Sequence, residues 1–596
     1  MKIISSRTIK FIYLIVFPYP LLIRCIFVED FIFNHLATRL YGSFQVVAHD
    51  SLIYFVMLLL FYISFIKRLP KLLSILLRIV GIVLFVIYIL DILALETFNT
   101  RLTLLDVLKY IVYTPTFIQI VYGGVTLVFI VFIFTMFVGI TIFFLFQKYT
   151  LNHKTHGVFL LFLSILLLLF CLRDNKGYVY SWVYKNIVEY NFVIMSQNSF
   201  YSEEFIRNIM ADTSYKENES CVKKKPQRKN IIILMVESFS PYQSKFFSGI
   251  KNWTPNIDSI AENNLSFTNF YSNGFITEDA EISILTGMFP IYGPLRQTKN
   301  RNSNFFRGYY GVPNSLPAVA RMNGYNTEFV TSADLNFSDT GNWAKSIGFD
   351  YIEGHEHPYY NNWKRYHFQA APDEALYSRV FDRVLQNQLN KPYLLFVKTV
   401  STHHPHINPE NDQYIESETF KYADKQLGLF YKKLSKSGFF KNGILVIVGD
   451  HHTMIPLKRE EIKKFGISNV LERVPLVISF GDKGGALEDR PFQQVDICNS
   501  LKNFISGEQC TSVWAGDLIN LPRFPPQYIV YKRGDNRDLV SIFCDHREIV
   551  VKLDGDKTRI LNPGDLDNPI LQLIVNKINR ERIVNQKRAN LIIPGF

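Results

Sequence analysis

Two aliphatic segments of the chain each end in side chains that can bind a metal ion. Residues 230–236 are followed directly by Glu237, and residues 444–449 are followed by Asp450 and His451. Short aliphatic runs of this kind are typical of parallel strands buried on both faces, and functional sites lie outside the carboxyl ends of such strands. Taken singly, a strand-end carboxylate is more often a helix cap or a surface group. Together, two carboxylates and a neutral imidazole suit a divalent cation such as manganese, magnesium or zinc.

A hydroxyl that could act as a nucleophile occurs in the segment 273–287. Gly274 permits a tight turn, and the apolar spacing within 280–285 predicts a helix that begins just after Thr277. A hydroxyl at a helix amino terminus lies where backbone NH groups and the helix dipole stabilise an incoming phosphate, and a divalent cation could activate it. The simpler alternative is that Thr277 only caps the helix.

Three histidines follow the aliphatic segment 393–400, again at the predicted carboxyl end of a strand. They are His403, His404 and His406. Because the unperturbed pKa of histidine lies near neutrality, such a side chain could bind a substrate phosphate or protonate a leaving alkoxide. We favour His403 for this role, and the alternative is that the three histidines form a polar loop without function.

Strand-like and helix-like segments alternate from residue 230 onward. Strands are predicted at 230–236, 326–330, 393–399, 443–449 and 474–480, and helices at 256–263, 279–286, 315–323, 372–388 and 418–437. This alternation is typical of an α/β domain with a mostly parallel sheet and helices on both faces. After Pro526 the pattern changes to hairpins and a helix over about 568–586, which predicts a small antiparallel C-terminal subdomain.

The amino-terminal part of the chain is far more apolar than the rest. It contains five apolar stretches, at 9–28, 51–66, 73–95, 118–146 and 156–173. Most of them are near or above the roughly 18 to 20 residues that a membrane-spanning helix needs. Basic residues before the first stretch, between the second and third, and between the fourth and fifth predict that these connections are cytoplasmic. Everything after Arg173 is then expected outside the cytoplasm.

Two details of this region stay open. A cleavable secretory signal is the competing interpretation of the first stretch, although no small-residue cleavage pattern follows Val28. The segment 101–115 suits either a helix in the membrane interface or a loop helix packed between spans. The formal net charge of +12 is explained by positive-inside loops and attraction to anionic lipids. Nucleic acid is excluded as a partner, because the basic residues are scattered and the catalytic half faces away from the cytoplasm.

Cysteines add little to the prediction. Cys221, Cys498, Cys510 and Cys544 would face an oxidising compartment, where disulfides are stable. Cys498 with Cys510 is one candidate bridge, but the sequence does not assign the connectivity.

The motifs of the second half, taken in order, resemble those of the alkaline phosphatase and sulfatase superfamily, specifically membrane enzymes similar to lipoteichoic acid synthases and phosphoethanolamine transferases. Each motif is weak alone, and the ordered set is specific. The matching segments are 236–238, 254–258, 277–281, 315–317, 324–325, 401–405, 449–451, 474–476 and 495–497. The resemblance implies that Glu237, Thr277, Asp450 and His451 hold the metal, with Thr277 as nucleophile and His403 in contact with the substrate phosphate.

Departures from the family pattern leave the transferred headgroup open. Glu278 stands where the phosphoglycerol transferases more often have a small polar residue. Trp343 is the candidate for headgroup binding, but with Lys345 it matches the family's Trp and Arg pair only loosely. The segment 277–281 lacks the Cys or Ser, Pro and Arg of a true sulfatase, which argues against sulfate-ester hydrolysis.

The resemblance implies a bacterial, multi-pass enzyme of the cytoplasmic (inner) membrane. It would move phosphoglycerol from phosphatidylglycerol to an extracytoplasmic glycan through a phosphothreonine intermediate. Its partners would be the lipid bilayer, a phospholipid donor and a glycan acceptor, and its cofactor a divalent metal, with manganese favoured over zinc or magnesium. The alternatives are phosphoethanolamine transfer to lipid A or another glycan, a phosphodiesterase in which water resolves the phosphothreonine, and a catalytically inactive membrane scaffold.

The predicted organisation has four parts. They are a transmembrane domain with five spans at 1–173, a juxtamembrane helix and linker at 174–229, a sulfatase-like catalytic domain at 230–525, and a C-terminal hairpin and helix subdomain at 526–596.

Overall fold

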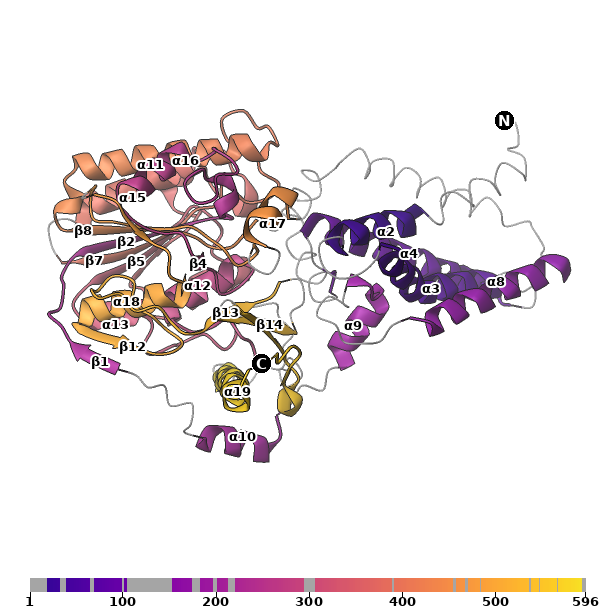
Figure 1. Ribbon diagram of the computed structural model, residues 1–596. Coiled ribbons are helices and arrows are strands. Elements are labelled where there is room, and N and C mark those ends of the chain that lie inside the picture. The colour runs from indigo at the N-terminus through magenta and orange to yellow at the C-terminus, as the bar shows by residue number, and fades with distance from the viewer. Residues whose placement is uncertain are drawn as a thin grey trace. The chain divides into compact units, whose positions relative to one another are not determined.

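The computed structural model describes most of the chain (Figure 1). The described residues are 19–32, 39–64, 69–98, 101–103, 153–173, 183–196, 201–212, 220–293, 306–387, 391–453, 457–466, 470–482, 484–534, 538–545, 547–564 and 566–591. The chain divides into two compact units, one of Met1–Leu108 with Gly124–Gln197 and one of Lys109–Gly123 with Asn198–Phe596. The finer domain boundaries expected near residues 173, 229 and 525 stay predictions.

The first unit is helical. Its described helices are α2 (Tyr19–Ile32), α3 (Arg39–Ser64), α4 (Lys71–Phe98), α8 (His153–Cys171) and α9 (Ile187–Ser196). Among the described residues, two segments are long and apolar enough to cross a membrane, Tyr41–Ser64 and Lys71–Ile92, and Leu160–Cys171 is a shorter apolar helix. The five predicted spans are therefore not established. The predicted span 118–146, the beginning of the first span and residues 104–115 lie outside the described part of the chain.

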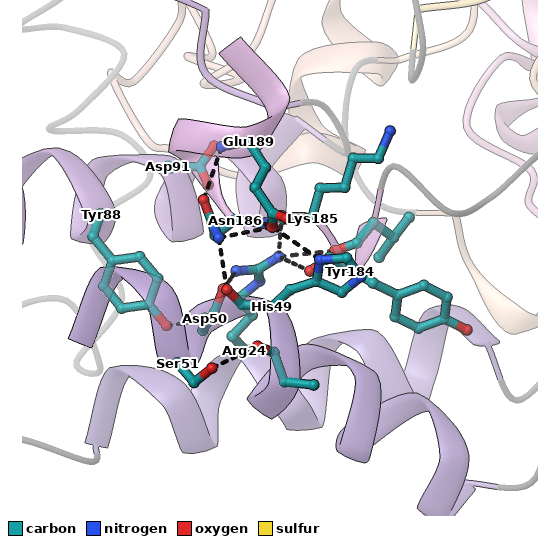
Figure 2. Close-up of polar contacts among 12 residues, drawn as sticks. Arg24, His49, Asp50, Ser51, Tyr88, Asp91, Tyr184, Lys185, Asn186 and Glu189 are labelled. Atoms are coloured by element: carbon teal, nitrogen blue, oxygen red, sulfur yellow. Dashed lines mark hydrogen bonds and ion pairs between the residues drawn. The ribbon is translucent and has the colours of Figure 1, made fainter. Parts of the chain in front are cut away.

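Charged side chains are buried together inside this unit (Figure 2). Arg24 pairs with Asp50, which also accepts a hydrogen bond of 2.6 Å from the Tyr88 hydroxyl, and Arg101 pairs with Asp91 at 2.5 Å. Arg24, Asp50 and Tyr88 are fully buried. The sequence pattern places Asp50 in a connection between spans, and this prediction is wrong. Asp50 lies inside α3, because Arg24 supplies the opposite charge that makes its burial possible.

The same arginines hold the segment that leads into α9. Arg24 donates to the three successive backbone carbonyls of residues 183–185 at 2.5 to 3.0 Å, and Arg101 donates to the last of these. Glu189, in the first turn of α9, lies 2.8 Å from Nδ1 of His49 on α3. The start of α9 is therefore attached to the long helices by charge-assisted hydrogen bonds.

The second unit is built on an eight-stranded sheet. Its strands are β2 (Asn230–Val236), β3 (Leu265–Phe267), β5 (Asn326–Thr331), β6 (Tyr351–Glu353), β7 (Tyr393–Lys398), β8 (Gly443–Gly449), β9 (Leu476–Ser479) and β10 (Ala486–Glu488). They follow the order β10-β3-β9-β8-β2-β7-β5-β6. β2 is parallel to both β7 and β8, whereas β9 is antiparallel to β8 and β3. The predicted mostly parallel sheet is thus confirmed.

Helices cover both faces of this sheet, as the alternation of buried side chains requires (Figure 1). Ile232 and Leu234 of β2 belong to a core formed with α11 (Pro255–Glu262), α15 (Asp373–Asn387) and α16 (Glu416–Lys436). Ile231 and Ile233 belong to the opposite core, formed with α12 (Thr277–Thr286), α13 (Leu316–Met322), α14 (Thr340–Ser346) and α18 (Gln494–Ser506). Because β2 is buried on both sides, it forms the centre of the unit.

Smaller elements complete the second unit. A four-stranded antiparallel sheet contains β13 (Ile529–Lys532), β14 (Leu539–Cys544), β15 (Arg547–Lys552) and β16 (Arg559–Ile560), followed by α19 (Asn568–Leu591). This confirms the predicted antiparallel tail. The remaining pieces are α10 (Glu203–Ala211), α17 (Arg459–Phe465) and the pairs β1 (Ser220–Lys223) with β12 (Glu508–Thr511) and β4 (Phe270–Tyr271) with β11 (Phe492–Gln493).

The disulfide differs from the candidate bridge. Cys221 is bonded to Cys510, because antiparallel pairing of β1 with β12 sets these two residues opposite each other. Cys498 is a free cysteine whose side chain is buried in the core on α18. Pairing of Cys498 with Cys510 is therefore wrong.

We expect Asp50→Ala to destabilise the first unit, because it leaves the Arg24 guanidinium buried without its carboxylate. Removing one partner of a buried ion pair costs about 3 to 5 kcal/mol. Thermal unfolding of the full chain in detergent micelles measures the effect, with Lys71→Ala, an exposed charge at the start of α4, as the control. The double variant Arg24→Leu/Asp50→Leu should recover part of the loss. Equal unfolding temperatures for Asp50→Ala and the unchanged protein would contradict this prediction.

Candidate active site

Strand register brings the predicted metal ligands together. β2 lies between β8 and β7, and Val236 pairs with Gly449. The residues that follow, Glu237 and Asp450, therefore leave the sheet side by side at the carboxyl edge. Ligand atoms of Glu237, Asp450 and His451 all lie within 4.8 Å of one another, and all three side chains are buried.

The backbone around this edge is tightly constrained. A Cβ atom on Gly449 would lie 2.1 Å from the carbonyl oxygen of Phe239, so only glycine fits there. Ser238 has a φ of 56°, a conformation that is costly for a residue with a side chain. Its N–H donates to Asp450 Oδ1 at 2.7 Å and its hydroxyl donates to Glu237 Oε1 at 2.7 Å. The strained residue thus orients both carboxylates.

Thr277 is the first residue of α12, and Ile276 occupies the N-cap position. The alternative that Thr277 only caps the helix is therefore wrong. Its hydroxyl instead lies 3.2 Å from Glu237 Oε2 and 3.3 Å from His451 Nε2. The amino terminus of α12, with its half-buried threonine, is directed at the ligand cluster.

The donor set fits a divalent cation. His451 Nδ1 lies 2.7 Å from the His452 carbonyl, which makes Nδ1 the protonated nitrogen and directs the lone pair of Nε2 toward the carboxylates. Burial and the nearby charge of Glu237 raise the pKa of Asp450 well above its usual range. Two carboxylates buried this closely repel each other, and a cation between them would remove the repulsion.

His403 lies close enough to the cluster for the charges of Glu237 and His451 to act on its pKa. Its Nδ1 lies 2.5 Å from the His404 carbonyl, so Nε2 is left as an acceptor. Burial lowers the pKa of His403, while the nearby charge of Glu237 opposes that shift. The His404 ring packs instead against that of His406, with centroids 5.5 Å apart.

Trp343 does not lie in a position to bind a headgroup. It is fully buried in the core on α14, its ring stacks on Phe306 with centroids 4.0 Å apart, and its Nε1 donates to the Tyr309 carbonyl at 3.1 Å. The predicted role of Trp343 is therefore wrong. The spacing of α14 turns this residue inward, while Lys345 is exposed.

Two turns near the start of α12 were not predicted from the sequence. They contain four non-glycine residues with φ between 53° and 60°, namely Ser338, Asp339, Phe368 and Gln369. The rings of Phe337 and Phe368 contact each other with centroids 4.5 Å apart, and the ring of Phe368 packs edge-on against that of His403 with centroids 4.8 Å apart. The Ser338 hydroxyl donates to Glu278 Oε1 at 2.5 Å. Strained backbone of this kind is concentrated at functional sites, but it cannot be predicted from the types of the residues that adopt it.

A buried ion pair lies one helical turn beyond Thr277. Glu281 is fully buried, and its Oε1 lies 2.9 Å from Lys398 Nζ on β7. Burial raises the pKa of Glu281 to about 7, although Lys398 opposes the shift. This carboxylate does not belong to the ligand cluster, so its removal is a control for the loss of a buried carboxylate.

Residues 229–503, which include all the site residues described so far, match the sulfatase family. Residues 229–503 are called the sulfatase domain after this match. The resemblance to the alkaline phosphatase and sulfatase superfamily is thus confirmed. A protein of the alkaline phosphatase superfamily from Vibrio parahaemolyticus has the same fold, with a TM-score of 0.50, 18% sequence identity, and coverage of 67% of this chain and 99% of that one.

Curated relatives of the sulfatase domain are distant in sequence. Lipoteichoic acid synthase 1 of Bacillus subtilis is 22% identical over 299 residues, which cover 46% of this chain and 45% of that protein. Phosphoglycerol transferase I of Xanthomonas euvesicatoria pv. vesicatoria is 25% identical over 247 residues, which cover 38% and 34%. The chain thus spans half or less of the length of these relatives.

We expect Mn²⁺ to raise the unfolding temperature of the full chain and Asp450→Asn to abolish this response. A ligand at about 100 times its Kd stabilises a protein by about 2.7 kcal/mol, and loss of one buried carboxylate removes a ligand that the cation needs. Thermal unfolding with and without MnCl₂ measures it. Glu281→Gln, which removes a buried carboxylate outside the cluster, should keep the response. A full Mn²⁺ response in Asp450→Asn would show that the cation binds elsewhere.

Proposed function

We propose that this protein transfers a phosphoglycerol group from phosphatidylglycerol to an extracytoplasmic glycan through a phosphothreonine on Thr277. The observation that carries the proposal is the Thr277 hydroxyl, 3.2 Å from Glu237 Oε2 and 3.3 Å from His451 Nε2 at the start of α12. Lipoteichoic acid synthases and phosphoglycerol transferases among the relatives support this choice of substrate class.

Glu237, Thr277, Asp450 and His451 would hold a divalent cation, with manganese favoured and zinc or magnesium as alternatives. When bound, the cation lowers the pKa of a coordinated hydroxyl and neutralises charge on the transferring phosphate. The hydrogen bond from Thr277 to Glu237 fixes the direction of the attacking lone pair. The dipole of α12 adds positive potential where the phosphate must lie.

The transfer takes two displacements at phosphorus. In the first, Thr277 Oγ1 gives up its proton and forms a bond to phosphorus, the bond to the lipid oxygen breaks, and diacylglycerol leaves with that proton. In the second, a glycan hydroxyl gives up its proton and forms the new bond to phosphorus, the bond from phosphorus to Thr277 Oγ1 breaks, and Oγ1 leaves with that proton. His403 Nε2, an acceptor in its neutral form, would contact the phosphate and carry the proton from the incoming hydroxyl.

Attachment to a membrane suits this reaction. The donor lipid is confined to the bilayer, and a catalytic unit joined to membrane-spanning helices meets it at a high effective concentration. We place the protein in the cytoplasmic membrane of a bacterium, with several spans and with the sulfatase domain outside.

Glu278 favours phosphoethanolamine as a second candidate group. This buried carboxylate follows Thr277 directly, and its charge acts to raise the pKa of His403. Its partner Ser338 adjoins Phe337, whose ring contacts Phe368. A carboxylate beside aromatic rings is complementary to an ammonium group rather than to neutral glycerol.

Thr277→Ala should abolish covalent labelling by phosphatidylglycerol, because no other hydroxyl replaces the nucleophile. The full chain in nanodiscs with phosphatidylglycerol and Mn²⁺ is analysed by intact mass for a phosphoglycerol adduct. Thr286→Ala, at the other end of α12, is the matched control, since its hydroxyl bonds only to backbone groups, the Ile282 carbonyl and the Met288 N–H. An adduct of the same yield on Thr277→Ala would refute Thr277 as nucleophile.

The headgroup is decided by offering each lipid separately. We expect phosphatidylglycerol to give the adduct and phosphatidylethanolamine to give little. The reverse result would establish the second candidate. Glu278→Gln should then slow labelling by phosphatidylethanolamine by about 10- to 100-fold, the range expected for a lost interaction between charged groups. Unchanged labelling in Glu278→Gln would mean that Glu278 does not bind the headgroup.

A further inference from the structure

The C-terminal sheet lies directly against the loop that precedes the nucleophile. Asn273 Nδ2 donates to the Val530 carbonyl of β13 at 2.7 Å, and the Lys532 N–H donates to the Asn273 carbonyl at 2.9 Å. A Cβ atom on Gly534 would lie 1.9 Å from the ring of Phe275, so glycine is needed for this approach. The two segments are therefore packed at backbone distance.

The Lys532 side chain reaches from β13 to α12. Its Nζ lies 2.8 Å and 3.1 Å from the two carboxylate oxygens of Asp279. Asp279 is fully buried, and the Lys532 side chain is 11% exposed. Lys532 Nζ also lies 4.1 Å from the ring centroid of Tyr292, whose hydroxyl donates to Asp279 Oδ1 at 3.0 Å. The position of the Asp279 carboxylate is thus set largely by groups outside α12.

Asp279 in turn controls the first turn of α12. It lies two residues after Thr277, and its Oδ2 accepts a hydrogen bond of 3.2 Å from the Phe275 N–H on the other side of the nucleophile. A Cβ atom on Gly274 would lie 2.4 Å from Asp279 Cβ, so the aspartate packs on the bare backbone of the loop. The loop and the helix start are thereby fixed on both sides of Thr277.

The C-terminal helix supports the other partner of Asp279. Arg582 Nε of α19 donates to the Tyr292 carbonyl at 3.0 Å, and Asn585 Nδ2 donates to the Ile291 carbonyl at 2.9 Å. β13 and α19 both follow residues 229–503, which match the sulfatase family. The strand supplies Lys532, which contacts Asp279, and the helix supports Tyr292, which also contacts Asp279.

We infer that Lys532 is a positioning residue for the nucleophile, acting through Asp279 to hold the Thr277 hydroxyl against Glu237 and His451. The inference rests on the proposed role of Thr277. An apolar residue at 532 would fill the same space, and buried ion pairs contribute little net stability. What the pair supplies is a fixed position for the carboxylate that orders the helix start. The C-terminal sheet is then part of the active site.

The test compares single-turnover rates of phosphothreonine formation in the full chain in nanodiscs at saturating phosphatidylglycerol. Lys532→Met should lower the rate on the order of 10²-fold, the effect of displacing a reacting atom by about 1 Å. The lipid concentration at half-maximal rate and the Mn²⁺ affinity should not change. Lys532→Met/Asp279→Asn, which removes both charges, should be faster than Lys532→Met alone. Arg533→Met is the matched control, because Arg533 pairs with Glu548 inside the C-terminal sheet.

Two results would overturn the inference. One is a wild-type rate in Lys532→Met, and the other is an equal loss in Arg533→Met, which would assign the effect to stability of the sheet. If the unchanged protein forms no adduct, the proposed function fails instead. A structure of full-length Lys532→Met then tests positioning alone, since the distance from Thr277 Oγ1 to Glu237 Oε2 should exceed 3.2 Å.

Discussion

The pairing of Val236 with Gly449 is the constraint on which the site depends. This register sends Glu237 and Asp450 out of the sheet at the same edge. A shift of one residue would turn the alternate side chains of β2 to the opposite face, exchange the two cores and separate the carboxylates. The aliphatic side chains that fill both cores therefore also determine where negative charge accumulates. Gly449 and Ser238 then supply the close approach and the strained turn that hold those charges together.

Sequence reasoning located those residues whose position follows from their neighbours along the chain. Glu237 and Asp450 could be found because a strand end is a local signal. Trp343 was misjudged because only the packing of α14 shows which way its ring turns. Lys532 carries no local signal at all, since its partner Asp279 is 253 positions away. The turns at Ser338 and Phe368 adopt backbone angles that their residue types do not favour, so tertiary contacts must impose them.

In the helical unit the prediction of the span boundary failed for a different reason. A hydropathy score takes no account of pairing between charges, so it treats Asp50 as a polar interruption and starts the span only after it. Inside α3 the carboxylate faces Arg24, and the pair carries no net charge. Burying a neutral ion pair costs less free energy than burying its two charges separately. This explains why the apolar segment Tyr41–Ser64 begins ten positions earlier than the predicted span 51–66.

The Cys221–Cys510 bond closes a loop of 289 positions immediately before β2 begins. Its place has a mechanical consequence. The chain reaches β1 after α10, which packs on α19, and the N–H groups of Lys224 and Gln227 donate to the carbonyls of Gly507 and Phe504 just beyond the bond. A pull on the chain that passes α10 is therefore borne by the covalent crosslink to β12 before it reaches β2. β2, which Glu237 follows directly, lies behind this crosslink, so movement of the preceding segment does not load the strand.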